Sequence, residues 1–551
     1  MANDTIEIHE KSFFEEGTTK AKSGLSAWIF STDHKRIGLM YLSAIAFFFL
    51  CAVIIGILMR LELIAPGKTI MGPQAYNTLF TLHGVIMIFL FIIPGIPAVF
   101  GNFFLPIMIG AKDVAFPRLN LLSFWIYIIG AALVLISLVL PGGPIDTGWT
   151  FYIPYSVRTS TNVSMAIFAA FVLGFSSILT GLNFITTVHR MRAPGMTFFR
   201  MPLFVWATYA TAWIQIIATP VIGITILLVI VERFFGVGIF DPALGGDPIL
   251  FQHLFWIYSH PAVYIMILPA MGVVSEIIPT FARRTIFGYK AIAYSSLAIA
   301  FVGYLVWAHH MFTSGMSDFS RMIFSLLTFI VALPSGVKIF NWVATMYKGS
   351  IDPKPPFLWV MTFIVLFSIG GLTGLVLGSL ATDVHVHDTY FVVAHFHYVM
   401  FGGTGTIFFA AAFYWFPKIF GKMYSIKWAN IGAAMFFISF NTLYFPKFIL
   451  GYMGMPRRYY DYLPQFQSLQ LVSTIGSWLM LITMVIVFGN LIYSFFKGQK
   501  APANPWGGVT LEWQIQSPPT LHNFHEIPTI THEPYDFTQI KKSAEGTGER
   551  L

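Results

Sequence analysis

The sequence predicts an all-α integral membrane protein, a bundle of twelve transmembrane helices, and three observations carry that prediction. Apolar residues make up 56% of the 551 residues and charged residues only 10%, whereas a water-soluble chain carries about 25% charged residues to solvate its surface. Twelve apolar segments are each long enough to cross a bilayer as a helix, which takes about 20 residues. The alternating pattern of a transmembrane barrel is absent, so these segments are predicted to be helical.

Pro, Gly and charged residues separate the apolar segments, as in the run from Asp352 to Pro356. The expected spans are 37–62, 76–110, 119–140, 164–188, 204–232, 250–279, 291–314, 320–346, 356–380, 391–416, 430–452 and 468–496. Together they form one membrane domain, 37–496. An N-terminal tail, 1–36, and a Pro-rich C-terminal tail, 497–551, flank this domain.

The distribution of lysine and arginine sets the expected orientation. Most of the 32 basic residues lie in the two tails and the even-numbered loops, so the positive-inside rule predicts that both tails are cytoplasmic. We expect a multi-pass protein embedded in a lipid bilayer, and we assign it to a bacterial cytoplasmic (inner) membrane. The net charge of +8 is dispersed and forms no stripe, which argues against nucleic-acid binding. The N-terminus lacks the pattern of a cleavable signal peptide.

Six of the fifteen histidines fall well inside the expected spans, where ionisable side chains are costly and indicate function. A single buried histidine more often makes an interhelical hydrogen bond. Six on four helices predict metal binding, because neutral imidazole is the commonest metal ligand. The six are His83, His260, His309, His310, His395 and His397.

The spacing of these histidines divides them into groups. His395 and His397 are two residues apart, so they point to nearly opposite faces of a helix and cannot share one metal. His309 and His310 are adjacent, about 100° apart on a helix, and both could reach one metal together with His260. Three imidazoles suit copper. One histidine then remains for an open haem and two remain for a six-coordinate haem. The spacing does not say which of His83, His395 and His397 binds which haem.

Eight motifs occur in order over nearly the whole chain. They are Thr32–Gly38, Leu82-His-Gly84, Ser259-His-Pro-Ala-Val-Tyr264, Trp307-Ala-His-His-Met311, His387-Asp-Thr-Tyr390, Val393-Ala-His-Phe-His-Tyr398, Gly454-Met-Pro-Arg-Arg458 and Asn504-Pro-Trp-Gly-Gly508. In these motifs the chain resembles the haem-copper oxidase superfamily, and within it subunit I of the cytochrome c oxidases.

The resemblance implies the cofactors and their ligands. It implies two haems, of A-type as expected for this subunit, and one copper ion. A low-spin haem would be bound by His83 and His397 and a high-spin haem by His395, while His260, His309 and His310 would hold the copper. Tyr264 would be cross-linked to the copper ligand His260 and would supply an electron and a proton to oxygen.

Further residues are implied near these groups. Arg457 and Arg458 would pair with haem propionates, and Arg60 and Trp149 would also contact the haems. Snorkelling to the interface competes for Arg60, and an aromatic-belt position competes for Trp149. The resemblance also places one magnesium ion at His387 and Asp388.

Two proton routes are implied. Lys338 is expected to be the only basic residue well inside a span, and with Ser335 on the same face it is similar to the lysine pathway of the family. Asn102, Asp113 and Asn120 keep the spacing of the second route, which Asn183 and Ser176 could continue.

One position departs from the commonest pattern of the family. Many relatives carry a gating glutamate where this chain has Ala262. Tyr258 lies one helical turn earlier, so its hydroxyl could reach the space of the missing carboxylate. With Ser259 it is similar to the subclass that uses a tyrosine–serine pair.

The implied function is that of the catalytic subunit of a proton-pumping terminal respiratory oxidase that reduces O₂ to water. The single cysteine, Cys51, cannot build a dinuclear copper entry site, so electrons are expected from cytochrome c, or a fused cytochrome c domain, through subunit II; subunit III is a further expected partner. The alternatives are a quinol oxidase and a nitric oxide reductase. Nitric oxide reductases of the superfamily generally lack residues that correspond to Lys338 and Tyr264. A secondary transporter would have no need of the six histidines.

Overall fold

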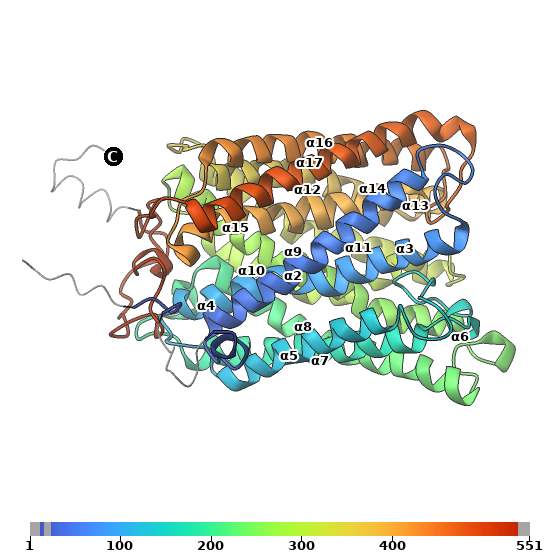
Figure 1. Ribbon diagram of the computed structural model, residues 1–551, viewed down its shortest axis with the longest axis horizontal. Coiled ribbons are helices and arrows are strands. Elements are labelled where there is room, and N and C mark those ends of the chain that lie inside the picture. Colours follow the sequence, from blue (N-terminus) through green and yellow to red (C-terminus); the bar gives the residue numbers. More distant parts are fainter. Residues whose placement is uncertain (1–10, 16–23, 538–551) are drawn as a thin grey trace, which may run out of the picture.

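Long helices that run side by side form the whole fold (Figure 1). The computed structural model describes residues 11–15 and 24–537, and within these ranges it contains no β-strand, only isolated bridges. Twelve helices of this described part are long and apolar enough to cross a membrane. The prediction of a twelve-helix all-α membrane protein is confirmed.

The helices follow the apolar segments closely. Three short ones lie outside the spans: α1 (Ser26–Ile29), α6 (Tyr155–Arg158) and α13 (Leu380–Val386). The spans are built from α2 (His34–Glu62), α3 (Pro73–Val85), α4 (Asn102–Met108), α5 (Pro117–Ile136), α7 (Val163–Arg190), α8 (Leu203–Phe235), α9 (Pro248–Ala282), α10 (Tyr289–Val302), α11 (Asp318–Met346), α12 (Pro355–Gly378), α14 (Tyr390–Val399), α15 (Thr406–Phe420), α16 (Ile426–Tyr452) and α17 (Gln467–Lys497).

Local sequence explains where several helices begin and end. The side chain of Asp33 accepts a hydrogen bond from the backbone N–H of Lys35 and caps α2, and Thr389 caps α14 in the same way. Proline occupies the first turn of α3, α5, α9 and α12, where its missing N–H costs nothing. Gly236 ends α8 with a φ of 63°, a left-handed conformation that glycine adopts without strain.

Two of the spans are interrupted by π-helical segments, although the sequence predicts regular helices there. The second span contains the π-helical segments η1 (Ile86–Ile92) and η2 (Gly95–Gly101), and η7 (Met400–Gly405) separates α14 from α15. Pro94 lies between η1 and η2, and a proline cannot donate the backbone hydrogen bond of a regular helix. Segment η7 contains three glycines in six residues, which weakens the preference for the α conformation.

The seventh span also differs from its expected form. The α-helix α10 ends at Val302, and His309 and His310 lie in a 3₁₀ segment, η6 (Trp307–Met311). A Cβ atom at Gly303, the residue after α10, would lie 2.5 Å from the ring of Tyr264. The chain therefore approaches α9 too closely for any larger residue at this point.

Buried basic residues are more numerous than predicted. Lys338 on α11 is 1% exposed, but Lys418 on α15 and Lys447 on α16 are also buried, at 0% and 5%. Lys338 is therefore not the only buried basic residue of these helices. The two others lie toward the ends of their apolar segments, where a lysine usually extends to water.

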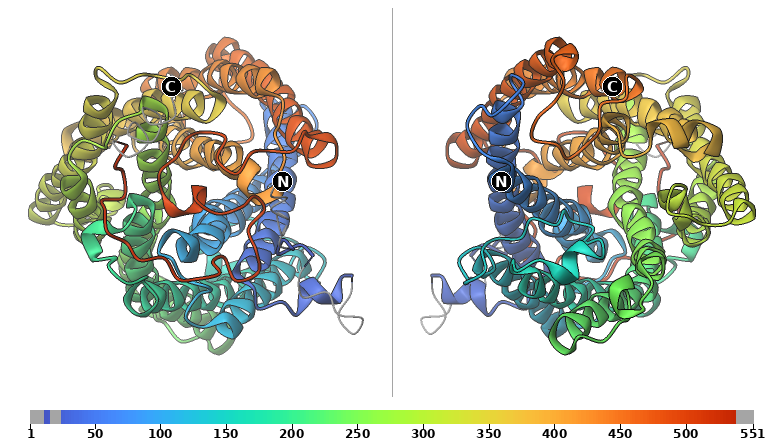
Figure 2. Two further views of the ribbon diagram at one scale, coloured as in Figure 1. Left: turned by 90° about the vertical axis from the view of Figure 1, so that its left-hand side faces the viewer. Right: turned by 90° about the vertical axis from the view of Figure 1, so that its right-hand side faces the viewer.

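The described residues nearest to both termini lie at the same end of the bundle, which we call the tail face (Figure 1). The C-terminal segment crosses this face (Figure 2, left). The buried side chain of Asn523 donates to the carbonyls of Ala111 and Lys112, at 3.0 and 3.2 Å, and accepts from Lys35 at 2.9 Å. Of the two expected tails, residues 1–10, 16–23 and 538–551 lie outside the described residues.

Candidate functional site

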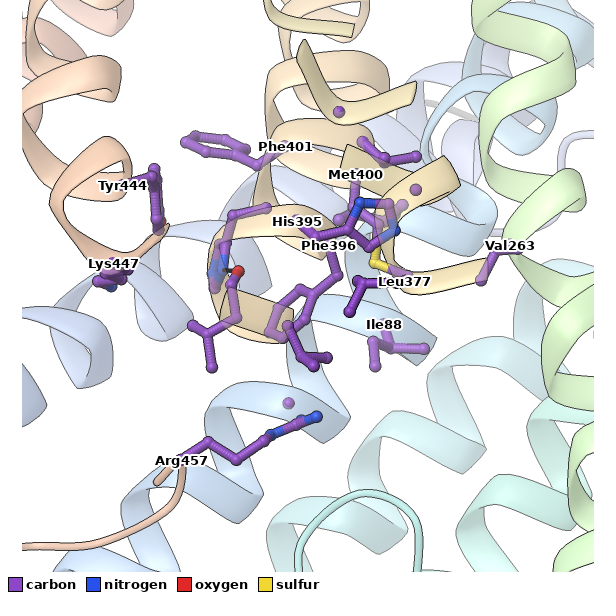
Figure 3. Close-up of a pocket in the computed structure, with 18 of the residues that line it drawn as sticks. Ile88, Val263, Leu377, His395, Phe396, Met400, Phe401, Tyr444, Lys447 and Arg457 are labelled. Atoms are coloured by element: carbon purple, nitrogen blue, oxygen red, sulfur yellow. Dashed lines mark hydrogen bonds between the residues drawn. The ribbon is translucent and has the colours of Figure 1, made fainter. Parts of the chain in front are cut away.

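One cavity of about 1120 Å³ inside the bundle brings together all six histidines predicted from the sequence. It extends between α16 on one side and α9 on the other, with α14 crossing between them (Figure 3). The histidines that line it are His83, His260, His309, His310, His395 and His397.

Three of these histidines form a compact cluster. Ring nitrogens of His260, His309 and His310 all lie within 4.8 Å of one another. Nδ1 of His260 lies 3.0 Å from Nε2 of His310, about the separation of two nitrogens that bind one ion at 2.0–2.1 Å. Among the residues that the structure describes, this is the one cluster of three His, Cys, Asp or Glu side chains close enough to hold a metal.

The rings around this cluster are held by packing. Trp256 stacks on His310 with ring centroids 3.7 Å apart and planes at 6°. Nδ1 of His309 lies 2.9 Å from the hydroxyl of Thr328, which itself donates to the carbonyl of Phe324. That hydroxyl must therefore accept from His309, so Nδ1 carries the proton and Nε2 presents its lone pair to a metal.

The other three histidines are oriented by the same device. Nδ1 of His83 lies 2.9 Å from the carbonyl of Ala52, and Nδ1 of His397 lies 2.8 Å from the carbonyl of Val393. A carbonyl can only accept, so each Nδ1 is the donor and each Nε2 is left for a metal. Nδ1 of His395 lies 3.2 Å from the hydroxyl of Thr373.

His395 and His397 lie on different sides of α14. His395 contacts α12, where a Cβ at Gly374 would lie 3.0 Å from its ring. His397 instead stacks on Tyr444 of α16, with ring centroids 4.2 Å apart. The two-residue spacing thus directs the two imidazoles to opposite faces, as the helical period predicts.

The cavity fits the groups that the histidine pattern implies. It is lined mainly by apolar side chains, and the ring nitrogens of three clustered histidines offer a donor set for one metal ion. A Cβ at Gly56 would lie 3.3 Å from the ring of His83, so small residues make room beside both His83 and His395.

Tyr264 and the polar residues expected at the haems lie at the same cavity. The rings of His260 and Tyr264 have centroids 4.9 Å apart. Arg60 is only 6% exposed and donates to the carbonyl of Gln470 at 2.7 Å, so it does not snorkel to water. Three more residues that were expected at the haems also line the cavity: Trp149, Arg457 and Arg458.

The loop before α14 holds the residues expected to bind magnesium. Nδ1 of His387 lies 2.9 Å from a carboxylate oxygen of Asp383, a residue that the prediction omitted. Burial opposes protonation of His387, but the hydrogen bond and charge of Asp383 outweigh it and raise its pKa. The side chain of Asp388 is 66% exposed and lies 3.7 Å from Arg457. Desolvation and the neighbouring Arg458 lower the pKa of Arg457 to about 10.

The residues expected on the lysine route lie between α10 and α11. Nζ of Lys338 donates to the hydroxyl of Ser296 at 2.7 Å and to the carbonyl of Ile292 at 3.2 Å. Ser335 lines the cavity one turn away. The amine is thus held among polar atoms of α10, next to the chamber that contains the histidines.

The second expected route starts at the tail face. Asn102 and Asn120 are buried, and Oδ1 of Asn102 and both amide atoms of Asn120 lack partners among the described residues. Such atoms are commonly satisfied by ordered water. Burial raises the pKa of Asp113 to about 7, and the nearby carboxylate of Asp33 adds to this effect.

Two residues that could continue this route differ in their contacts. Ser176 bonds to the hydroxyl of Tyr41 at 3.2 Å and to the carbonyl of Ser123. The amide of Asn183 is already engaged, accepting from the backbone N–H of Phe116 at 2.9 Å and donating to its carbonyl. Asn183 therefore holds the loop that follows Asp113.

Tyr258, Ser259 and Ala262 are all buried on α9, at 5%, 3% and 3% exposure. Oγ of Ser259 has no partner within the described residues. The helical turn before Ala262 thus offers two hydroxyl groups and no carboxylic acid.

Lys447 is the functional candidate that the sequence reasoning missed. It lines the cavity from α16, and its Nζ lies 4.6 Å from the ring centroid of Tyr444. Its position inside the expected span 430–452 was the available signal, since a basic residue within a span indicates function.

Comparisons with known proteins agree with this geometry. Residues 36–479 match the family model "Cytochrome C and Quinol oxidase polypeptide I". The chain is 44% identical to cytochrome c oxidase subunit 1 of Thermostichus vulcanus, covering 96% of each chain. It is 46% identical to that of a Synechocystis species, covering 92% of each, and 41% identical to that of Cereibacter sphaeroides, covering 96% of this chain and 98% of the relative.

A solved structure of a haem-copper terminal oxidase dimer shares the fold. Its TM-score is 0.65 at 19% identity, and the match covers 93% of this chain and 99% of the other. At this identity the likeness speaks for the fold alone. With the family match and the curated relatives, it follows that the chain belongs to the subunit I family of the haem-copper oxidases and is the catalytic subunit of a terminal oxidase.

Proposed function

We propose that the chain reduces O₂ to water with electrons from cytochrome c and couples this reaction to proton pumping. The observation that carries the proposal is the single cavity with six histidines on its wall, three of them clustered and two others, His83 and His397, with Nε2 free. In this assignment His260, His309 and His310 hold copper, His395 holds a high-spin haem, and His83 and His397 hold a low-spin haem. The haems are of A-type.

When bound, the high-spin haem and the copper would supply the electrons and the binding site for oxygen. The protein positions the rest. Tyr264 lies beside the copper ligand His260 and donates a proton from its hydroxyl. Arg60 and Trp149 border the haem cavity, and Arg457 and Arg458 present guanidinium groups that suit propionates.

Protons reach this site by two routes. Lys338, with Ser335, accepts protons from the cytoplasmic side and passes them toward Tyr264. Asp113 is the entrance of the second route, and Asn102 and Asn120 hold water along it. The orphaned amide atoms of these two asparagines support the second route.

The second route ends at a hydroxyl pair instead of a carboxylic acid. Ala262 leaves no acid on this turn of α9, and Tyr258 and Ser259 are buried beside it. We assign the chain to the tyrosine–serine subclass, in which hydroxyls and water relay the proton.

A partner subunit delivers the electrons. A single cysteine, Cys51, cannot build a dinuclear copper site. Subunit II therefore carries that site, and subunit III is a further partner. The donor is cytochrome c, free or fused to a partner; the three curated relatives named above are cytochrome c oxidases. Magnesium binds at His387 and Asp388, where Asp383 supplies a second carboxylate. The tail face is cytoplasmic in the inner membrane of a bacterium.

Purification of the complex tests this function. The expected result is a Soret band with two haems and one copper per subunit I, together with oxygen uptake driven by reduced cytochrome c. If the complex contains haem but oxidises quinol and not cytochrome c, the electron donor is quinol. A preparation without haem or copper would remove the whole proposal.

A further inference from the structure

Lys447 places an amine beside a proposed haem ligand. It belongs to α16, is 5% exposed, and lines the cavity. Its Nζ lies 4.6 Å from the ring centroid of Tyr444, which stacks on His397 at 4.2 Å. Figure 3 shows Lys447 and Tyr444 together on one side of the cavity, facing the turn that carries His395 and Phe396.

The amine of Lys447 differs from those of the other buried lysines. Lys338 donates to Ser296 and Ile292, and Lys418 donates to the carbonyl of Ile515 at 2.5 Å. Within the part of the chain that the structure describes, Nζ of Lys447 has no hydrogen bond or ion pair; it lies over the face of Tyr444, and it interacts electrostatically with Arg60, a charge of the same sign. A buried lysine without a partner is costly, so its partner belongs to the group that fills the cavity.

We propose that Lys447 directs its ammonium group at the low-spin haem and raises the reduction potential of that haem. This inference rests on the proposed function, because it requires a haem held by His83 and His397. A positive charge in a low-dielectric site favours the state with one more electron, and protein charges near a cofactor tune its electronic properties. No bond forms or breaks at Lys447; the electron comes from the donor of the complex.

Lys447 is therefore a tuning residue and not a catalytic one. Its contact within the described residues is with Tyr444, and not with the clustered histidines or Tyr264. Its charge shifts the equilibrium between oxidised and reduced low-spin haem. It therefore changes the fraction of electrons that stay on this haem before they pass to the oxygen site.

The test compares variants of the purified complex by spectroelectrochemical titration of the low-spin haem. Lys447→Met removes the charge at similar length, and Lys447→Arg keeps it. Lys427→Met is the matched control, because Lys427 lies on the same helix but is exposed. If the Met variant does not accumulate, Lys447→Gln removes the charge with a polar side chain and carries the same expectation.

We expect Lys447→Met to lower the ratio of reduced to oxidised low-spin haem about tenfold at a fixed potential, which is a midpoint about 59 mV lower for one electron. Lys447→Arg and Lys427→Met should keep the midpoint of the parent. An unchanged midpoint in Lys447→Met, with both haems bound, overturns the proposal, and so does an equal shift in the Lys427 control. A parent complex without a low-spin haem spectrum would instead refute the proposed function.

Discussion

Asp113 is a carboxyl group that titrates near neutral pH at the proposed proton entrance. Its pKa is raised from 3.8 to about 7, first by burial and then by the carboxylate of Asp33. The displacement corresponds to about 4 kcal/mol of preference for the protonated form. At pH 7 the group is therefore about half protonated, and at pH 8 about one tenth of it is. An unperturbed aspartate would be almost fully ionised at both values.

If turnover depends on a proton held by Asp113, its rate should follow the protonated fraction of Asp113 as the pH changes. In proteoliposomes we expect oxygen uptake and proton pumping to decline as the pH on the tail-face side rises through about 7. Asp113→Asn should lower turnover at least about tenfold, since positioned proton-transfer groups contribute about 10²–10⁴, and the remaining rate should lack this decline. The raised pKa also stabilises the fold below the unfolded pKa, and that contribution is lost as the pH rises through about 7.

Asp352→Asn is the control for this experiment, because Asp352 is a loop carboxylate whose contacts do not include the proposed route: it pairs with Lys354 at 3.9 Å. It should keep both the rate and the pH profile of the parent. The reasoning is refuted if Asp113→Asn pumps at the parent rate, or if the decline near pH 7 persists in that variant.

Four further variants test three other parts of the structure. Tyr258→Phe should lower turnover and pumping at least about tenfold, much more than Ser259→Ala; equal, near-parental pumping of both in proteoliposomes removes the gating role. His309→Leu should lose the copper, measured by elemental analysis, and retain the low-spin haem spectrum, whereas full copper occupancy contradicts the assigned ligand set. Glu62→Gln should lower the free energy of unfolding by about 2 kcal/mol, because its buried carboxylate accepts three backbone N–H groups; an unchanged thermal midpoint in detergent would show that the charge is not needed.

Hydropathy predicted the spans and the six histidines inside them, and the family resemblance implied the other residues around the cavity, but neither predicted the local departures from helical geometry. The number of spans follows from the length of apolar runs, which the bilayer fixes. The 3₁₀ segment at His309 and His310 depends on how closely Gly303 approaches Tyr264, a contact between two helices that periodicity does not describe.

Burial near span ends was equally hard to predict. Lys447 lies five residues before the end of α16, where a lysine in a single helix would reach water. Here the packing of neighbouring helices closes that route, as its 5% exposure shows. Asp383 was missed for a related reason: its contact with His387 depends on α13, a short helix in a stretch that sequence reasoning treated as a loop.

The hydrogen bonds of Asn523 to Lys35, Ala111 and Lys112 have a consequence for biosynthesis. Lys35 and Asn523 are separated by 488 positions in the chain, so the ribosome makes the first long before the second. All twelve spans can enter the membrane while the carbonyls of Ala111 and Lys112 still lack the amide that later binds them. The face that carries Asp113 is thus completed last, after translation has passed the final span. Premature release of the nascent chain would leave an inserted bundle that is still open at the proposed proton entrance.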